Sequence, residues 1–190
     1  MYAKKASLKP MSDISYRGMA LLYKISSPFC SVKRQINLLQ LKNGMVVVDW
    51  GCGTGRHTIP VAQSIGEEGK VFAVDIHPLA IKTIRKKAKQ NGLLNIEPLL
   101  ISSYDTEAKS ASVDLVLLID IIPIIQETKP LFTEIYRLLK KQGRVYISHS
   151  HLSMEKTRKL VEDSSLFTVS ECKGHDMIIV PIENSDSASP

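Results

Sequence analysis

The chain has few aromatic residues, few cysteines and no long apolar segment. Aromatic residues make up 6% of its 190 residues, and basic clusters interleaved with aromatic residues, typical of surfaces that bind single-stranded nucleic acid, are absent. The longest apolar run, at 115–125, is interrupted by Asp120 and Pro123, so we expect a core strand and loop and no membrane-spanning segment. The cysteines are odd in number and widely spaced, which argues against a disulfide framework and favours a reducing compartment: Cys30, Cys52 and Cys172.

A secretion signal is not recognisable either. The lysines of residues 4–9 are not followed by the apolar core of a signal peptide, so we expect a cytoplasmic protein. The net charge of +6 has two explanations, a basic face for nucleic acid or solvated helix surfaces. The basic clusters lie at 83–90, on one expected helix surface, and at Lys140-Lys141, at the expected end of another, where cations suit the helix dipole. We therefore expect no nucleic-acid partner.

One stretch carries most of the functional information: an apolar strand that runs directly into a glycine-rich turn. It covers residues 46–55, with the sequence Val-Val-Val-Asp-Trp-Gly-Cys-Gly-Thr-Gly. A second apolar run, 71–75, ends in Asp75, where a carboxylate is placed to hold the two hydroxyls of a ribose. The glycine spacing is G-x-G-x-G, and Arg56 occupies the third-glycine position of dinucleotide sites, which counts against a nicotinamide cofactor.

Strands and helices alternate from Met45 onward, which predicts an α/β fold with a doubly wound, mostly parallel sheet of seven strands. Pro98 removes a ladder donor from the third strand, so we expect that strand at an edge of the sheet. The last two strands are expected to form a hairpin. The expected strands are 46–50, 71–75, 96–101, 114–119, 144–148, 167–171 and 177–182, and the expected helices are 55–65, 78–91, 130–141 and 154–163.

The chain is expected to form one domain with a helical preface and a polar tail. Residues 1–45 form the preface, residues 46–182 the sheet domain, and residues 183–190 a disordered tail. Two helices with apolar faces are expected in the preface, separated by a break at Ser27-Pro28. One face comprises Met19, Leu21, Leu22 and Ile25, and the other Val32, Ile36, Leu38 and Leu39. Oligomeric state is left open.

The order of strand, acid, glycine turn, helix, strand and second acid resembles the class I methyltransferases that use S-adenosylmethionine (AdoMet). Within that class the chain resembles the small stand-alone enzymes of the UbiE-like group. The resembling segments are 48–55, 74–78, 112–116 and 138–144. The resemblance implies an α/β/α sandwich, AdoMet as cofactor, S-adenosylhomocysteine as product, and a preface that covers the substrate side.

The resemblance also implies which residues hold the cofactor. Asp49 would orient the loop toward the methionine end, Asp75 would take both ribose hydroxyls, and Ile76 would lie against adenine. Ser102 or Ser103 stands where the family often has an acid for the adenine amino group, and Asp105 follows shortly after. The complete implied set is Asp49, Gly51, Cys52, Gly53, Gly55, Asp75, Ile76, Ser103, Tyr104, Asp120 and Ile121.

Methyl transfer from a sulfonium needs alignment more than acid–base help, so the lack of an obvious base does not exclude an enzyme. His149 and His151, after the fifth strand, are the candidate general bases, and their alternative is a role as polar loop groups. Together with Cys172 and His175 they could in principle bind zinc, although a buried, apolar role for Cys172 and no metal is the expectation.

The expected function is therefore transfer of a methyl group to a small-molecule acceptor by in-line displacement. Residues 120–123 lack the N/D-P-P-Y/F pattern of many enzymes that methylate bases or glutamine, which disfavours a nucleic-acid substrate. Three alternatives stay open: a non-catalytic AdoMet-binding scaffold, an RNA methyltransferase and a nicotinamide oxidoreductase. The acceptor and the methylated atom are not predictable from the sequence.

Overall fold

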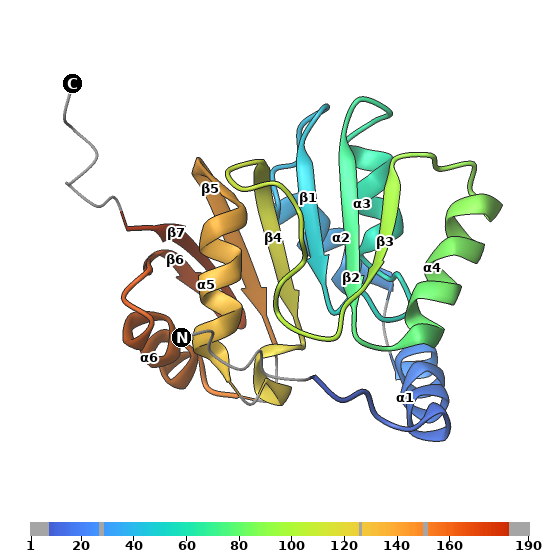
Figure 1. The fold of residues 1–190 in the computed structure, drawn as a ribbon, viewed down its shortest axis with the longest axis horizontal. Coiled ribbons are helices and arrows are strands. Elements are labelled where there is room, and N and C mark those ends of the chain that lie inside the picture. Colours follow the sequence, from blue (N-terminus) through green and yellow to red (C-terminus); the bar gives the residue numbers. More distant parts are fainter. Residues whose placement is uncertain (1–7, 27–28, 126, 150–151, 183–190) are drawn as a thin grey trace. The chain divides into compact units, whose positions relative to one another are not determined.

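A computed structural model describes residues 8–26, 29–125, 127–149 and 152–182, with side chains except those of 23–26 and 29–31. The chain divides into two compact units, with the boundary between Glu107 and Ala108. Figure 1 labels the helices and strands along the chain. The polar tail and the break at Ser27-Pro28 lie outside the described residues. The predicted division into preface, sheet domain and tail stays a prediction.

The described residues of the first unit form three parallel strands and four helices. Val47 pairs with Val71 and Val71 with Ile96, so the apolar runs found in the sequence lie side by side. Helix α3 packs against β2, and α4 packs against β2 and β3. The elements are α1 (Asp13–Ser26), α2 (Phe29–Leu38), β1 (Val46–Trp50), α3 (Thr58–Ser64), β2 (Lys70–Asp75), α4 (Pro78–Gln90) and β3 (Ile96–Leu100).

Helix α3 begins later than the sequence predicted. We expected it to start at Gly55, and it starts at Thr58. Gly51, Gly53 and Gly55 have φ angles of 75°, 49° and 78°, all in the left-handed region, which a right-handed helix cannot include. The glycine turn therefore extends to His57, and the helix follows only after it.

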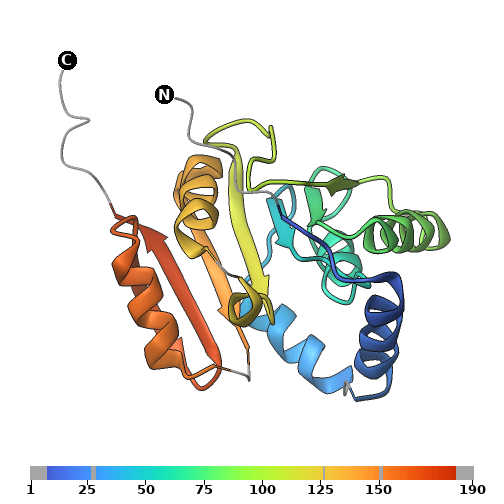
Figure 2. The ribbon, with the colours of Figure 1, turned by 60° about the horizontal axis from the view of Figure 1, so that its bottom comes forward.

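The N-terminal helices differ from the predicted pattern of apolar faces. Figure 2 shows α1 and α2 as two separate, differently inclined rods. Leu21 and Leu22, expected on a buried face of α1, are 58% and 67% exposed. Among the described side chains of α1, at residues 13–22, Tyr16 is buried, at 5% exposed, and Met19 is half-buried. The Ile25 side chain lies outside the described part. Helical spacing therefore predicted the helix but not the burial of Tyr16 or the exposure of Leu21 and Leu22.

In the second unit, the part of the chain that the structure describes forms four strands, two α-helices and one short 3-10 helix. Strands β4 and β5 are parallel, and β7 pairs antiparallel with both β5 and β6, which confirms the expected terminal hairpin. Ser153 caps α6 by accepting from the Lys156 N–H, as the sequence indicated. The elements are β4 (Val113–Ile119), η1 (Ile122–Ile124), α5 (Thr128–Leu138), β5 (Leu139–Ser148), α6 (Met154–Asp163), β6 (Phe167–Lys173) and β7 (Asp176–Pro181).

Lys140 and Lys141 do not close a helix, contrary to the prediction. Strand β5 already begins at Leu139, whose backbone is extended with φ −68° and ψ 139°. Leu139 pairs with Val113 of β4, and the next pair is Arg144 with Leu115. The residues between Leu139 and Arg144 therefore form a bulge in the strand. Lys140 Nζ lies 2.8 Å from Asp114 Oδ1. Its charge is matched by a β4 carboxylate and not by a helix dipole.

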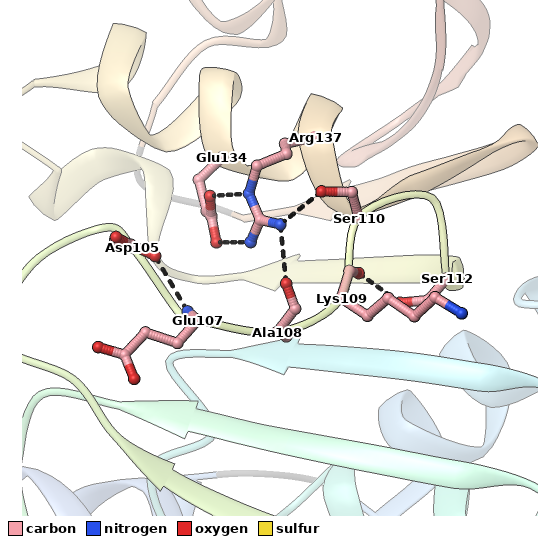
Figure 3. A network of polar contacts seen from close by, with 8 residues as sticks. All are labelled: Asp105, Glu107, Ala108, Lys109, Ser110, Ser112, Glu134 and Arg137. Atoms are coloured by element: carbon pink, nitrogen blue, oxygen red, sulfur yellow. Dashed lines mark hydrogen bonds and ion pairs between the residues drawn. The ribbon is translucent and has the colours of Figure 1, made fainter.

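Arg137 ties the loop before β4 to helix α5. Its guanidinium donates to both carboxylate oxygens of Glu134, at 2.8 and 2.7 Å. The same group donates to the Ala108 carbonyl at 2.7 Å and to the Ser110 hydroxyl at 2.8 Å. Figure 3 shows the guanidinium between these partners. A planar cation with several donors is well suited to such a junction.

The strand order is β3-β2-β1-β4-β5-β7-β6 in one seven-stranded sheet. The fold is therefore the mostly parallel α/β architecture that the sequence predicted, with β3 and its Pro98 at an edge. Among the described residues, no helix combines the length and the apolar character that crossing a bilayer requires.

Candidate functional site

The buried carboxylate of Asp75 is the centre of the candidate site in the first unit. It stands at the end of β2 and is 9% exposed. Its Oδ2 accepts the Gly53 N–H at 2.9 Å, and its Oδ1 accepts the His77 N–H at 2.8 Å. Burial raises the pKa of Asp75, and these N–H groups oppose that rise. Each oxygen retains capacity to accept a further hydrogen bond.

The glycine turn is fastened to the end of β2 through its backbone. The Gly51 and Cys52 N–H groups both donate to the Val74 carbonyl, at 2.8 and 3.0 Å. Since Gly53 in turn donates to Asp75, three consecutive N–H groups of the turn are directed at the end of β2. The sequence predicted this neighbourhood of turn and acid, and the structure brings the two together.

The second and third glycines of the turn have different surroundings. A Cβ on Gly53 would meet only the Gly51 carbonyl, at 3.8 Å, so the space beside Gly53 is open. A Cβ on Gly55 would lie 2.7 Å from the Ile84 Cδ1 atom, so Gly55 is needed for packing of the turn against α4. Gly53 thus provides an open backbone surface on which a ligand can lie.

Asp49 holds the turn from the other side. Its Oδ2 accepts the Thr58 hydroxyl at 2.5 Å, which links the end of β1 to the first residue of α3. Burial raises the pKa of Asp49 to about 6, and the nearby charge of Asp75 adds to the rise, while the Thr58 hydrogen bonds oppose it. Thr58 was not singled out from the sequence, although a hydroxyl at a helix start is a common capping signal.

The turn after β3 also reaches the Asp75 region. The Ile101 N–H donates to the Asp75 carbonyl at 3.0 Å. In the following residues Ser103 is half-buried and Tyr104 is buried, while Ser102 is exposed. Asp105 is exposed, and its Oδ1 accepts the Glu107 N–H at 3.0 Å. One oxygen of this acid therefore serves its own turn.

Sequence reasoning missed a stacked pair beside Asp75, formed by Tyr16 of α1 and His77. The two rings are 4.2 Å apart between centroids and 22° from parallel. His77 is also the N-cap of α4, because its Nδ1 accepts the Leu79 N–H at 3.2 Å. Burial, followed by the charges of Asp75 and Cys52, raises the pKa of Tyr16. A histidine directly before Pro78 could have indicated the cap, whereas nothing in one sequence indicates the stack.

Ile76, directly after β2, is half-buried. The other predicted site residues belong to the second unit. Asp120 follows β4 with φ 57°, a conformation uncommon for residues other than glycine, and its N–H donates to the Ser148 carbonyl at 2.8 Å. Ile121 is buried. His149 is also buried, and its Nε2 lies 2.7 Å from the Thr157 hydroxyl of α6. His151 lies outside the described residues.

Two further expectations concern cysteine and metal. Cys172 is exposed on β6, so its predicted role as a buried apolar residue is wrong; the antiparallel edge strand leaves most of its residues in solvent. Among residues 8–26, 29–125, 127–149 and 152–182, no three histidine, cysteine or acidic side chains are grouped to hold a metal ion. His175 is exposed, and its carbonyl accepts the His149 N–H at 3.3 Å.

A glycine turn after β1, an acid at the end of β1 and a buried acid at the end of β2 define the class: an α/β protein with a nucleoside-binding edge. The described residues fit an adenosyl group in two respects. Asp75 has acceptor capacity for ribose hydroxyls, and the backbone of Gly53 is open on one side. The strand order with a terminal antiparallel hairpin is that of the class I methyltransferases.

Comparison with known families identifies the particular one. A family model described as a methyltransferase domain matches residues 41–185, so the chain belongs to that family. It is a class I member, and AdoMet is the cofactor of this class. This decides against the nicotinamide oxidoreductase alternative.

Individual relatives agree with the family assignment. The chain is 33% identical over 85 residues to aklanonic acid methyltransferase of Streptomyces sp., covering 45% of this chain and 39% of that protein. It is 31% identical over 105 residues to arsenite methyltransferase of Halobacterium salinarum, covering 55% and 27%. A SAM-dependent methyltransferase of Aquifex aeolicus has a similar fold, with TM-score 0.75, 17% identity and coverage of 90% and 97%. The chain spans less than half the length of these curated relatives.

Proposed function

We propose that this protein transfers the methyl group of AdoMet to a small-molecule acceptor by in-line displacement. The observation that carries the proposal is the buried Asp75 carboxylate, which accepts the N–H of an open glycine turn and keeps acceptor capacity for a ribose. When bound, AdoMet supplies a methyl group on a cationic sulfonium, and attack by the acceptor breaks the methyl–sulfur bond. The chain's own residues have to bind, orient and exclude water.

Each proposed cofactor contact is assigned to a part of AdoMet. Asp75 takes the ribose hydroxyls, and Gly51, Cys52 and Gly53 offer their backbone to the ribose and methionine. Asp49, held by Thr58, orients the loop and stands near the methionine ammonium. Gly55 maintains the packing of the turn. The remaining proposed contacts in the first unit are Ile76, Ser103 and Tyr104 for adenine, and a role of Asp120 and Ile121 at the sulfonium stays a prediction.

Two observations support a small molecule as the acceptor: the names of the relatives and the sequence of residues 120–123. The relatives are named for aklanonic acid, arsenite and demethylmenaquinone. Residues 120–123 lack the aromatic platform of many base-methylating enzymes. No proton step is assigned to His149, since one ring nitrogen already contacts Thr157. A general base at His149 or His151 and a cytoplasmic location stay predictions.

Parallel calorimetric titrations with AdoMet, S-adenosylhomocysteine and NAD test the cofactor assignment. We expect the two adenosyl ligands to bind in the micromolar range and NAD not to bind. Asp75→Ala should weaken adenosyl binding at least tenfold, because two ribose contacts are lost. Glu134→Gln, in the second unit, is the matched control at a buried acid and should leave the affinity unchanged. Equal affinity of wild type and Asp75→Ala would contradict the ribose assignment.

A second measurement tests the acceptor class. Purified protein is incubated with methyl-labelled AdoMet and with either a small-molecule extract or total RNA, and the labelled fraction is identified. Label in the small-molecule fraction supports the proposal. Label in RNA would favour the RNA methyltransferase alternative, and binding without any transfer would favour the non-catalytic scaffold.

A further inference from the structure

Among the described residues, three buried side-chain polar atoms of the first unit have no hydrogen-bond partner: the Tyr16 hydroxyl, His77 Nε2 and Asn95 Oδ1. The first two belong to one stacked pair. Both side chains are almost fully buried, at 5% and 3% exposed. Asp13 Oδ1 lies 3.7 Å from His77 Nε2, beyond hydrogen-bond distance, and the Asp13 side chain is mostly exposed. Buried polar groups are nearly always paired, so two orphans in one stacked pair require an explanation.

The hydrogen-bonding role of His77 follows from its cap. Because Nδ1 accepts the Leu79 N–H, that nitrogen carries no proton, and Nε2 is the protonated nitrogen. His77 therefore presents a donor without an acceptor. The Tyr16 hydroxyl is a second potential donor in the same stack. The pair thus offers two donors and lacks an acceptor-rich group to receive them.

The position of the Tyr16–His77 pair indicates which acceptor group would receive its hydrogen bonds. His77 follows Asp75 by two residues, and its N–H donates to the Asp75 carboxylate. The phenol of Tyr16 lies close enough to Asp75 and Cys52 for their charges to raise its pKa, yet it is bonded to neither. In Figure 1, α1 lies at the end of α4 that begins with Pro78, in agreement with the ring contact. Tyr16 therefore adjoins the proposed ribose site.

We infer that Tyr16 is a cofactor-binding residue, whose hydroxyl, with His77 Nε2 beside it, donates hydrogen bonds to the adenosyl part of AdoMet, so that α1 covers the cofactor. The inference rests on the proposed function, because it needs an adenosyl ligand at Asp75. Ribose oxygens and adenine ring nitrogens supply the acceptors that the pair lacks. Helix α1 thereby gains a role beyond packing: it contributes a specific contact to the ligand.

A purely structural role does not account for the hydroxyl. Stacking on His77 needs only the ring, which phenylalanine would supply equally well. An unpaired hydroxyl in the ligand-free protein destabilises the fold, since its bonds to water are lost on burial. Tyr16→Phe should therefore leave ligand-free stability unchanged or increase it, while weakening ligand binding. Opposite signs for stability and affinity separate a ligand contact from a packing residue.

The test compares wild type, Tyr16→Phe and Tyr136→Phe. Tyr136, in α5 of the second unit, donates to the Ile182 carbonyl at 3.3 Å and provides the matched hydroxyl deletion. The probes are S-adenosylhomocysteine and 5′-methylthioadenosine, which share the adenosyl group and differ in the amino-acid end. We expect Tyr16→Phe to weaken both probes by the same factor, about three- to tenfold, and Tyr136→Phe to weaken neither.

Each result has a defined consequence. Unchanged affinity in Tyr16→Phe, or a loss confined to S-adenosylhomocysteine, would overturn the adenosyl contact while leaving the proposed function intact. A lower ligand-free melting temperature in Tyr16→Phe would show a packing role and also overturn it. If wild type binds neither probe, the proposed function fails first, and this inference fails with it.

Discussion

Two clusters of buried polar groups, one around Asp176 in the second unit and one formed by Tyr16 and His77 in the first, differ in how completely they are paired. In the second unit, Asp176 accepts hydrogen bonds from Tyr146 at 2.6 Å and Ser148 at 2.8 Å. In the first unit, the Tyr16 hydroxyl and His77 Nε2 have no partner among the described residues. Paired groups stabilise a fold, whereas unpaired buried groups cost stability and persist where a ligand completes them. The difference supports the proposal that the Tyr16–His77 pair belongs to a ligand site, whereas the Asp176 cluster stabilises the fold.

Removing a paired group in the second unit should give the largest change. Asp176→Ala leaves two buried hydroxyls, on Tyr146 and Ser148, without their acceptor. We expect the free energy of unfolding to fall by about 3 kcal/mol, from one or two kcal/mol for each orphaned group. Urea unfolding measures it. A change below about 1 kcal/mol would mean that these bonds do not stabilise the unit. The contrast between the paired Asp176 cluster and the unpaired Tyr16–His77 pair would then not hold.

The first unit contains two buried titratable groups whose effects on stability oppose each other. Burial raises the pKa of Asp49 from 3.8 to about 6, so the folded state holds its proton longer and stability falls as pH rises through this interval. Burial and the charge of Arg56 lower the pKa of His57 from 6.5 to about 4, so the unfolded state binds more protons and stability rises with pH. Over about two pH units the two effects largely cancel.

Single substitutions should therefore uncover opposite pH dependences. Relative to wild type, Asp49→Asn should make stability rise by about 2 kcal/mol between pH 4 and 6, because the fall in stability that Asp49 causes over this interval is removed. His57→Gln should make it fall by about the same amount. The free energy of unfolding is measured with urea at several pH values for each variant and for wild type. In the difference between variant and wild type, the contributions of the other carboxylates cancel. Two curves of the same slope would refute the assignment of these groups.

The glycines test the same distinction between packing and binding within one turn. Gly55→Ala should cost about 2 kcal/mol of stability, because its methyl would overlap Ile84 and its φ of 78° is left-handed. Gly53→Ala should cost only about 1 kcal/mol, for the φ of 49°, since its surroundings are open. Its larger effect should be on calorimetric affinity for S-adenosylhomocysteine. A Gly53→Ala protein that binds normally would show that the ligand lies elsewhere.

How far the sequence predicted the site depends on how local each contact is. The glycine turn, Asp49 and Asp75 were predictable because strand periodicity and fixed spacing place them at the ends of neighbouring strands. Pro98 predicted the edge strand for a similarly local reason. The early start of β5 was missed because Lys140 and Lys141 extend a helix-favouring run. The stack of Tyr16 on His77 joins residues 61 positions apart, and no periodicity encodes such a contact.

The smallest expected effects come from removing one hydroxyl from a buried tyrosine in each unit. They allow the most direct comparison, because the same substitution is made at a paired and at an unpaired hydroxyl. Tyr146→Phe should lower the free energy of unfolding by about 1 kcal/mol, because the phenol bonded to Asp176 is lost. Tyr16→Phe should change it by zero or by a gain of about 1 kcal/mol, because an unpaired hydroxyl is removed. Urea unfolding without ligand measures both. Equal losses in the two variants would mean that the Tyr16 hydroxyl is paired in solution, and the contrast between the structural Asp176 cluster and the ligand-binding Tyr16–His77 pair would no longer hold.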